Sequence, residues 1–285
     1  MTQTKKSAKK FVVANWKMHG NLKQNQALLQ NYAQTLTKLK HTQVVVCAPY
    51  PYLGQLQNML ANTDIAWGAQ NVAKSEFGAF TGEVSATMLT DFGCKFVIIG
   101  HSERSTAYCE SDENIATKFM QAKKHGLTPI LCVGETLIER EAGMMEMVVG
   151  KQLDAIINTP GAEVFANTVI SYEPIWAIGT GLAATPEQAK SMHLFIRNKI
   201  ANLNADAANH LKILYGGSVN PQNAVQLFVV DYIDGGLIGK CSLNAQEFAA
   251  ICHAAEISSY PPRVQLMSRP RTKSVLSHAF SLAQI

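Results

Sequence analysis

The apolar residues of this chain gather into eight short runs, separated by longer stretches that mix apolar and polar positions. Most of the runs are continuously apolar, as expected of parallel strands that are buried on both faces. The stretches between them carry helix signals, such as Thr185 followed by Pro186 and Gln188, which form an N-cap, a first-turn proline and a capping-box partner. The pattern predicts strands at residues 11–15, 43–48, 64–70, 95–100, 128–134, 168–173, 212–217 and 231–239.

Eight strands that alternate with helices in 285 residues predict an α/β fold, a single closed (β/α)8 barrel. An open doubly wound sheet is the alternative, and it favours a G-x-G-x-x-G motif after the first strand, where this chain has NWKMHGN. We expect the barrel to occupy residues 11–255. Residues 256–285 are then a C-terminal extension, whose structure the sequence does not determine.

The formal net charge of +4 is concentrated at the two ends of the chain. Residues 1–10 contain four lysines, and residues 261–285 contain four basic residues and no acid, so removing both sets leaves −4 for residues 11–260. We therefore expect residues 1–10 to be a basic, disordered tail on a mildly acidic body. Because nucleic-acid binding needs basic residues clustered on a folded face, no nucleic-acid partner is expected.

Neither a membrane nor a secretory role is indicated. No apolar run approaches the roughly 18 residues that are needed to span a bilayer. The six cysteines are scattered, without a C-x-x-C pair or a histidine at metal-binding spacing. This usage is typical of a reducing compartment, so we predict a cytoplasmic protein without structural zinc.

Polar residues and glycines follow several of the predicted strands. In a (β/α)8 barrel the functional groups lie at the C-terminal ends of the strands, so these residues should meet at one mouth. The candidates are Asn15 and Lys17 after the first strand, His101, Ser102 and Glu103 after the fourth, Glu173 after the sixth, Gly217 and Ser218 after the seventh, and Gly239 after the eighth.

Glu173 is the most informative candidate, because it ends an apolar strand and precedes Pro174 and Trp176. Apolar surroundings disfavour a charged carboxylate, which suits the residue to accept a proton as a general base. A structural acid paired with an arginine is the alternative. His101 precedes a segment that can begin a helix, whose N-terminal partial charge favours a neutral imidazole that donates a hydrogen bond. A capping or packing histidine is the alternative there.

Lys17 at the mouth can anchor an anionic substrate, although most lysines are solvated surface groups. The turns YGGSV and DGGLIGK follow the last two strands, where (β/α)8 barrels frequently bind phosphate through backbone N–H groups. A pair of glycines alone indicates only a tight turn. Two such turns after consecutive strands favour a phosphate site.

The motifs ANWKM, AQNV, GAFTGEVS, GHSERS, CVGE, YEPIWAIGTG, YGGSV and LIGKCSL resemble those of the triosephosphate isomerase family, in the same order, from about residue 11 to 255. The resemblance implies a TIM barrel that interconverts dihydroxyacetone phosphate and D-glyceraldehyde 3-phosphate through an enediol(ate). That family uses a glutamate as the base and a neutral histidine as the hydrogen-bond donor. The resemblance implies these roles for Glu173 and His101. Lys17 and Asn15 would stabilise the developing negative charge.

The resemblance also implies how the substrate is held, without a metal or an organic cofactor. Backbone N–H groups of Gly179, Ser218, Gly239 and Lys240 would bind the phosphate. A lid would close over it and exclude water, formed by Pro174, Ile175, Trp176, Ala177, Ile178, Gly179, Thr180, Gly181 and Leu182. A further loop would insert into a twofold-related partner and make a homodimer, formed by Phe77, Gly78, Ala79, Phe80 and Thr81.

Three residues depart from the family pattern. Lys240 stands where a second glycine is usual in the family. Leu182 stands where a basic residue is common, and Ser105 where the family has an arginine behind the histidine. A positive φ at Lys240 would be strained. Two alternatives remain, another phosphosugar isomerase or epimerase on the same barrel, and a non-catalytic barrel that binds acidic partners through its basic tails. The presence of both Glu173 and Lys17 favours catalysis.

Overall fold

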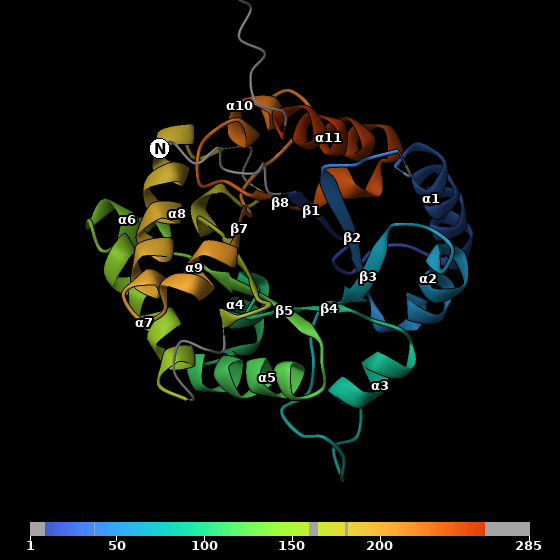
Figure 1. Ribbon diagram of the computed structural model, residues 1–285. Coiled ribbons are helices and arrows are strands. Elements are labelled where there is room, and N and C mark those ends of the chain that lie inside the picture. The colour runs from blue at the N-terminus through green and yellow to red at the C-terminus, as the bar shows by residue number, and fades with distance from the viewer. Residues whose placement is uncertain (1–8, 37, 160–164, 180–181, 260–285) are drawn as a thin grey trace, which may run out of the picture.

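Parallel strands pair in chain order, and β1 pairs with β2 on one side and β8 on the other, which closes the sheet into a barrel (Figure 1). The computed structural model describes residues 9–36, 38–159, 165–179 and 182–259. Within these residues the strands are β1 Lys10–Asn15, β2 Thr42–Ala48, β3 Ala66–Ala69, β4 Phe96–Ile99, β5 Thr128–Val133, β6 Val169–Tyr172, β7 Lys212–Tyr215 and β8 Gly235–Ile238. The predicted (β/α)8 barrel is confirmed. The eighth strand is shorter than predicted, because the chain turns through Tyr232 with φ of 70° before β8 begins.

Helices surround the barrel and connect its strands (Figure 1). Thr185 and Gln188 form the predicted capping box at the start of α8. The helices are α1 Leu22–Thr35, α2 Leu53–Leu60, α3 Ala86–Asp91, α4 Ser102–Tyr108, α5 Asp112–Lys124, α6 Leu137–Glu141, α7 Met145–Ile157, α8 Pro186–Ala201, α9 Ala205–His210, α10 Ala224–Phe228 and α11 Ala245–Ser258, with short 3-10 helices η1 Tyr50–Tyr52, η3 Ile175–Ala177 and η4 Lys240–Leu243.

The last helix continues three residues beyond position 255, where the sequence placed the end of the barrel. Near its end, the Glu256 carboxylate accepts hydrogen bonds from the backbone N–H groups of Lys40 and His41, just before β2. The Ser259 hydroxyl donates to the His41 carbonyl oxygen at 3.2 Å. These contacts fasten the end of α11 to the barrel. The expected tails at residues 1–8 and 260–285 lie outside the described residues.

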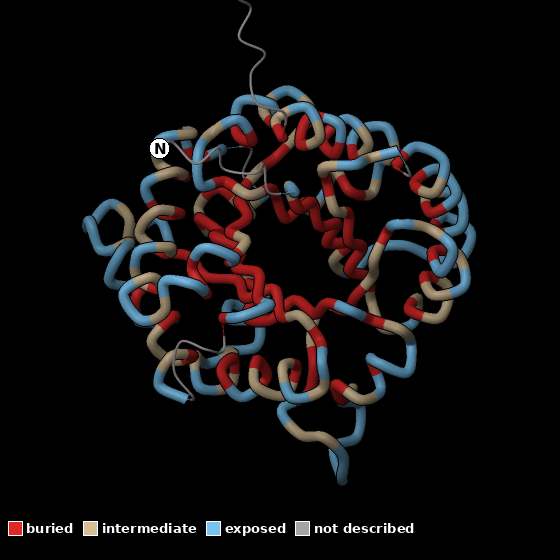
Figure 2. Tube along the Cα trace, viewed as in Figure 1, coloured by how far each residue is buried: buried red, intermediate tan, exposed pale blue. Residues whose placement is uncertain are grey.

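The alternation of side chains along the strands separates two apolar layers, and the strands form the buried ring in Figure 2. Phe11 and Val13 of β1 belong to a cluster that consists only of strand residues, which fills the interior of the barrel. Val12 and Ala14 belong to the larger cluster between the strands and the helices. Asn15 has the same parity as Phe11 and Val13, so its side chain follows theirs towards the barrel axis.

His193 of α8 is completely buried behind β6. Its Nδ1 lies 3.0 Å from the Tyr232 carbonyl oxygen and donates to it, and its ring packs edge-on against Tyr172 with 5.9 Å between centroids. Burial lowers the pKa of His193 to about 4. The imidazole is therefore neutral in the folded protein at neutral pH.

This buried histidine predicts a loss of stability in mild acid. Between pH 6.5 and 4 the unfolded chain takes up a proton at this position that the folded protein does not, so the free energy of unfolding falls as the pH drops. At pH 5 the loss is about 2 kcal/mol relative to pH 7. In urea titrations, His193→Gln should reduce the difference between pH 7 and pH 5 by about that amount. His210→Gln, at an exposed histidine, is the control, and equal differences in both variants would refute the assignment.

Candidate active site

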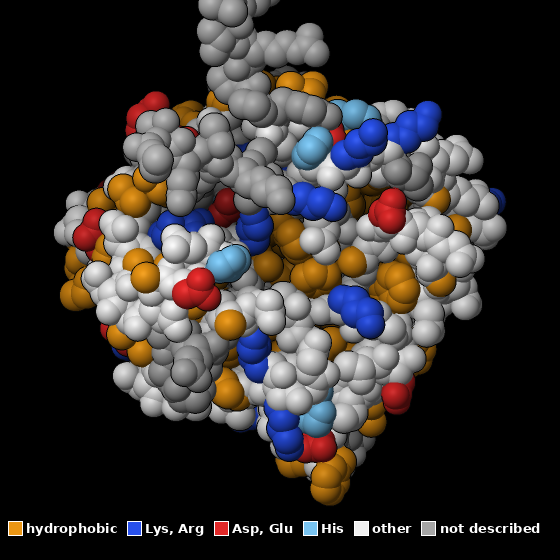
Figure 3. Space-filling view, in the orientation of Figure 1, with side chains coloured by type: hydrophobic (Ala, Val, Ile, Leu, Met, Phe, Trp, Pro, Cys, Tyr) orange, Lys and Arg blue, Asp and Glu red, His pale blue; other side chains and the backbone are white. Residues whose placement is uncertain are grey.

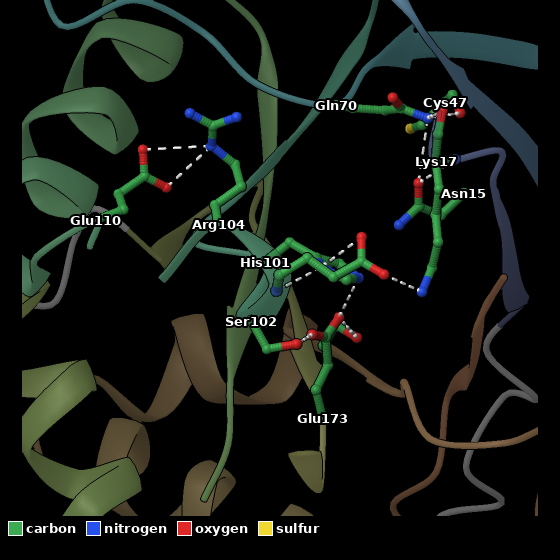
Figure 4. Close-up of polar contacts among 11 residues, drawn as sticks. Asn15, Lys17, Cys47, Gln70, His101, Ser102, Arg104, Glu110 and Glu173 are labelled. Atoms are coloured by element: carbon green, nitrogen blue, oxygen red, sulfur yellow. Dashed lines mark hydrogen bonds and ion pairs between the residues drawn. The ribbon is translucent and has the colours of Figure 1, made fainter. Parts of the chain in front are cut away.

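The C-terminal ends of β1, β4 and β6 bring Asn15, Lys17, His101, Ser102 and Glu173 into one group (Figure 4). The side chains are linked by a chain of polar contacts. The Lys17 ammonium pairs with the Glu103 carboxylate, and the Glu103 backbone N–H donates to His101. His101 and Ser102 both lie next to the Glu173 carboxylate. The strand ends therefore join residues that are up to 158 positions apart in the sequence, from Asn15 to Glu173.

Glu173 is almost completely buried, with 1% of its surface exposed. The Ser102 hydroxyl donates to its Oε2 at 3.4 Å and the Ser171 hydroxyl to its Oε1 at 3.5 Å. No lysine or arginine among the described residues forms an ion pair with it, which disfavours the structural alternative of an arginine-paired acid. Space for the side chain comes from Gly216, where a Cβ would lie 2.6 Å from the Glu173 Cγ.

Cys132 of β5 adds a neutral group beside the carboxylate. Burial, followed by the charge of Glu173, raises the pKa of the Cys132 thiol far above its ordinary value. The thiol therefore stays protonated. Glu173 is surrounded by neutral groups that can donate hydrogen bonds, two hydroxyls and this thiol, rather than by a cation.

His101 is also buried, at the N-terminus of α4. Its Nδ1 accepts a hydrogen bond from the backbone N–H of Glu103 at 3.2 Å. An accepting Nδ1 carries no proton, so the ring is neutral and its proton is on Nε2. That Nε2 lies 3.8 Å from the Glu173 Oε1. The predicted neutral imidazole is the form that this hydrogen bond selects.

Lys17 has a left-handed backbone, with φ of 53°, immediately after β1. Two side chains hold it there, since the Asn15 Oδ1 accepts from the Lys17 N–H at 3.0 Å and the Gln70 Nε2 donates to the Lys17 carbonyl oxygen at 3.0 Å. The Lys17 ammonium forms an ion pair with Glu103 at 2.5 Å. An unfavourable backbone conformation that is held by several contacts is typical of a functional site.

The glycine-rich turn after β8 lies directly beside this lysine. A Cβ at Gly239 would be 3.3 Å from the Lys17 Cε and 3.9 Å from its Nζ. Lys240 begins the 3-10 helix η4 and is not among the described residues with positive φ. The expected strain at Lys240 is therefore wrong, because Gly239 makes the turn and Lys240 already has a helical backbone.

The turn after β7 is joined to the segment that follows Glu173. The Ser218 hydroxyl donates to the Ala177 carbonyl oxygen at 2.7 Å, and the Tyr215 hydroxyl accepts from the Ala184 N–H at 2.9 Å. Gly217 lies against the Tyr215 side chain. A Cβ at Gly217 would be only 2.3 Å from the Tyr215 hydroxyl oxygen, so a larger residue does not fit at this position. The turn therefore holds both ends of the expected lid.

The first half of the lid also rests on a buried acid. Glu135, which has no exposed surface, accepts hydrogen bonds from the Trp176 Nε1 at 3.1 Å and the Tyr172 hydroxyl at 3.0 Å, and it pairs with Arg140 at 3.1 Å. Arg140 in turn lies 5.0 Å from the centre of the Trp176 ring. Further along, Gly179 has φ of 71° and Leu182 is exposed, whereas Thr180 and Gly181 lie outside the described residues.

The loop between β3 and α3 does not join this group within its own chain. Residues 77–81 are all exposed, and 83% of Phe77 and 51% of Phe80 is accessible. In Figure 1 the loop projects beyond the ring of helices, and Figure 3 shows hydrophobic side chains at its tip. Two accessible phenylalanines on a projecting loop are typical of a contact surface.

The residues of the site that were not among the sequence-predicted candidates include Gln70, Glu135, Tyr215 and Gly216. Gln70 follows β3 and Glu135 follows β5, so the rule that functional groups lie at strand ends could have found both. Tyr215 ends an apolar run, and nothing in the sequence indicates that its hydroxyl binds the backbone at Ala184. Gly216 is the first of two adjacent glycines, and the sequence does not distinguish it from Gly217. Only the structure shows that the Glu173 side chain lies against Gly216.

The described residues form neither a metal-binding cluster nor a membrane-spanning helix. No group of three or more His, Cys, Asp or Glu residues in that part of the chain could hold a metal ion. No helix there is long and apolar enough to cross a membrane.

Comparison with known proteins matches the whole barrel. A family model described as triosephosphate isomerase matches residues 10–255. The chain is 53% identical to the triosephosphate isomerase of Dechloromonas aromatica over 247 residues, which cover 87% of this chain and 99% of that protein. It is 56% identical to the enzyme of the same name from Thiobacillus denitrificans, over 87% of this chain and 98% of that protein.

Substitution of Glu135, the buried acid that accepts a hydrogen bond from Trp176, should have a large effect on stability. Glu135→Gln removes the charge that faces Arg140 and should lower the free energy of unfolding by about 3 kcal/mol in urea titrations. Tyr172→Phe removes one hydrogen bond to the same carboxylate and should cost about 1 kcal/mol. If the two variants were equally stable, Glu135 would not be the centre of this network.

Proposed function

The chain belongs to the triosephosphate isomerase family, and from that premise we propose that Glu173 and His101 catalyse its reaction, the interconversion of dihydroxyacetone phosphate and D-glyceraldehyde 3-phosphate. One observation carries the proposal. A buried carboxylate, without a lysine or arginine partner among the described residues, lies 3.8 Å from the protonated nitrogen of a neutral imidazole at the mouth of a (β/α)8 barrel.

Glu173 removes the proton from the carbon beside the substrate carbonyl and returns it to the neighbouring carbon. His101 donates its Nε2 proton to the carbonyl oxygen and then transfers protons between the two oxygens of the enediol(ate). A neutral imidazole suits this exchange, since it can give a proton to one oxygen and recover one from the other. Ser102 supports the pair by its hydrogen bond to Glu173, and Glu103 fixes the tautomer of His101 through its backbone N–H.

Lys17 and Asn15 stabilise the negative charge that develops on the substrate oxygens. The short contact of Lys17 with Glu103 holds the ammonium at the mouth, beside His101 and Gly239. A fixed cation at this place stabilises charge in the transition state without having to reorganise during the reaction. This role also explains why the chain keeps an unfavourable backbone at Lys17.

The phosphate group is bound by backbone N–H groups of Gly179, Ser218, Gly239 and Lys240, with Gly217 allowing the turn. The lid at residues 174–182 closes over it and excludes water, because an enediolate phosphate exposed to water would lose its phosphate. The anchors of the lid at Trp176, Ala177 and Ala184 support this role. No metal or organic cofactor takes part in the proposal.

The functional unit is a homodimer in which the loop at residues 77–81 inserts beside Asn15 and His101 of the partner subunit. We place the enzyme in the cytoplasm, where its six cysteines remain thiols, and we assign it no nucleic-acid or membrane partner. On the face drawn in Figure 3, acidic side chains are scattered among the basic ones, which does not favour a polyanion-binding surface. No feature favours another phosphosugar reaction or a non-catalytic role.

The first test concerns the base. Glu173→Asp withdraws the carboxylate by about 1 Å, and a misplacement of that size should reduce kcat about a hundredfold. The measurement is a coupled assay of glyceraldehyde 3-phosphate isomerisation on the purified protein without added cofactor. Glu187→Asp, at the first turn of α8, is the control. Full activity of Glu173→Asp would remove Glu173 from the mechanism.

The second test concerns the dimer. Unmodified protein should elute at twice the mass of one chain in size-exclusion chromatography with light scattering. The double change Phe77→Ser and Phe80→Ser should give monomers and reduce turnover at least tenfold, because each site would lack the partner's loop. Leu203→Ser, at another exposed apolar residue, should change neither property. A fully active monomer would contradict the dimer proposal.

A further inference from the structure

Tyr32 of α1 places a hydroxyl group deep in the layer between the strands and the helices. Its side chain is completely buried, and its ring packs against Phe248 of the neighbouring helix α11, with 5.0 Å between centroids (Figure 1). The hydroxyl donates a hydrogen bond to the Ser242 carbonyl oxygen in the 3-10 helix η4. A side chain of α1 is therefore joined to the turn that follows β8, 210 residues further along the chain.

The Tyr32 hydroxyl stays protonated and can donate this bond at any ordinary pH. Burial, followed by the nearby Cys252, raises the pKa of Tyr32 well above its usual value, whereas the Trp16 side chain lowers it. Trp16 is itself completely buried and immediately precedes Lys17. The hydroxyl is therefore close both to the segment that carries Lys17 and to the backbone of η4.

Ser242 transmits the contact to the glycine that makes the turn. The Ser242 hydroxyl donates to the Gly239 carbonyl oxygen at 2.7 Å, and the Ser242 backbone N–H donates to the same oxygen at 2.8 Å. Gly239 and Lys240 are two of the residues whose backbone N–H groups are proposed to bind phosphate. Gly239 also lies against Lys17, because a Cβ at Gly239 would be 3.3 Å from the Lys17 Cε. Tyr32 is therefore connected to this turn through a single residue.

Such a connection affects how well the turn binds an anion. Backbone N–H groups bind most tightly when they already point at the position of the anion, because no free energy is then spent on ordering them. Removing the Tyr32 hydroxyl leaves the buried Ser242 carbonyl oxygen without this donor, which is unfavourable. A shift of η4 that relieved the loss would also displace the N–H groups of Gly239 and Lys240.

We propose that Tyr32 is a positioning residue for the phosphate-binding turn, which it holds through the Ser242 carbonyl oxygen. The proposal rests on the proposed function, in which the N–H groups of Gly239 and Lys240 bind the substrate phosphate. These groups bind the phosphate in the substrate and in the transition state alike, so displacing them weakens binding without slowing the chemical step. The alternative is a tyrosine that only stabilises the core, whose loss would lower stability and leave binding unaltered.

The experiment compares the unmodified full chain with Tyr32→Phe, which keeps the aromatic ring and removes only the hydroxyl. KM for glyceraldehyde 3-phosphate and the inhibition constant of inorganic phosphate should both rise about fivefold, the size expected for one hydrogen bond. kcat should stay within twofold, because Glu173 and His101 are not displaced. The assays are run at a temperature where circular dichroism shows the variant to be folded. An unchanged KM and inhibition constant would overturn the proposal.

Leu29→Ala is the matched control, on the same helix and in the same buried layer but without a polar group. In urea titrations it should destabilise the protein at least as much as Tyr32→Phe, because it leaves a cavity. Its KM and its inhibition constant for phosphate should equal those of the unmodified protein. If Leu29→Ala raised both to the same extent, a weakened core would account for the effect of Tyr32→Phe, and the positioning role would be refuted.

A second variant tests the connection through Ser242 and takes the place of Tyr32→Phe if that variant fails to fold. Ser242→Ala removes the hydroxyl that binds Gly239, so it should also raise the inhibition constant of phosphate while kcat stays within twofold. An unchanged constant in folded Ser242→Ala would count against the proposal. If both residues act on one turn, the double variant should bind phosphate about as weakly as the weaker single variant, whereas independent effects would multiply. Multiplied effects would contradict a shared connection.

Failure of the proposed function gives a different result. In that case Glu173→Asp keeps its full rate, or inorganic phosphate does not compete with the substrate in the unmodified protein. If only the role of Tyr32 is wrong, Glu173→Asp is slow and phosphate competes, but neither KM nor the inhibition constant responds to Tyr32→Phe.

Discussion

The burial of the Glu173 carboxylate is the constraint on which the rest of the site depends. A buried charge costs several kcal/mol unless hydrogen bonds or an opposite charge compensate it. Here the compensation comes from the hydroxyls of Ser102 and Ser171 and from a neutral thiol, Cys132, while Lys17 is paired with Glu103 instead. An arginine partner would stabilise the carboxylate more strongly and would make it a poorer proton acceptor. The site buries the acid and, among the described residues, gives it only neutral hydrogen-bond partners.

The closed barrel makes this arrangement possible. Because parallel strands all end on the same side, groups that follow β1, β4, β6, β7 and β8 meet around one opening. Glycines allow these groups to approach one another closely. A Cβ at Gly216 would overlap the Glu173 side chain, and a Cβ at Gly239 would crowd the Lys17 side chain. Hydrogen bonds of Ser218 and Tyr215 join the same opening to Ala177 and Ala184, so the turn proposed to bind phosphate and the segment proposed to cover it are held together.

The sequence predicted all eight strands and several of the residues that meet at their C-terminal ends, because both depend on local patterns. Continuous apolar runs specify buried parallel strands, and polar residues directly after such runs specify the mouth. The errors have equally local causes. The eighth strand was predicted too long because the turn at Tyr232 lies close to the apolar residues Val230 and Ile233. Strain was expected at Lys240 because it stands where a second glycine is usual, whereas in the structure Gly239 makes the turn and Lys240 begins a 3-10 helix. Glu135 was not a candidate, because a single acid after a strand does not indicate that three side chains will meet on it.

By itself the sequence determined the barrel, the family and the chemical types available at the strand ends, since apolar periodicity and short motifs are properties of neighbouring residues. Only the tertiary structure decided which groups touch. The neutral form of His101 follows from the backbone N–H of Glu103, and the position of Lys17 follows from Gln70, which lies just after β3. Such contacts join residues that are distant in the chain, and distances of a few ångströms between them are fixed by packing rather than by sequence spacing.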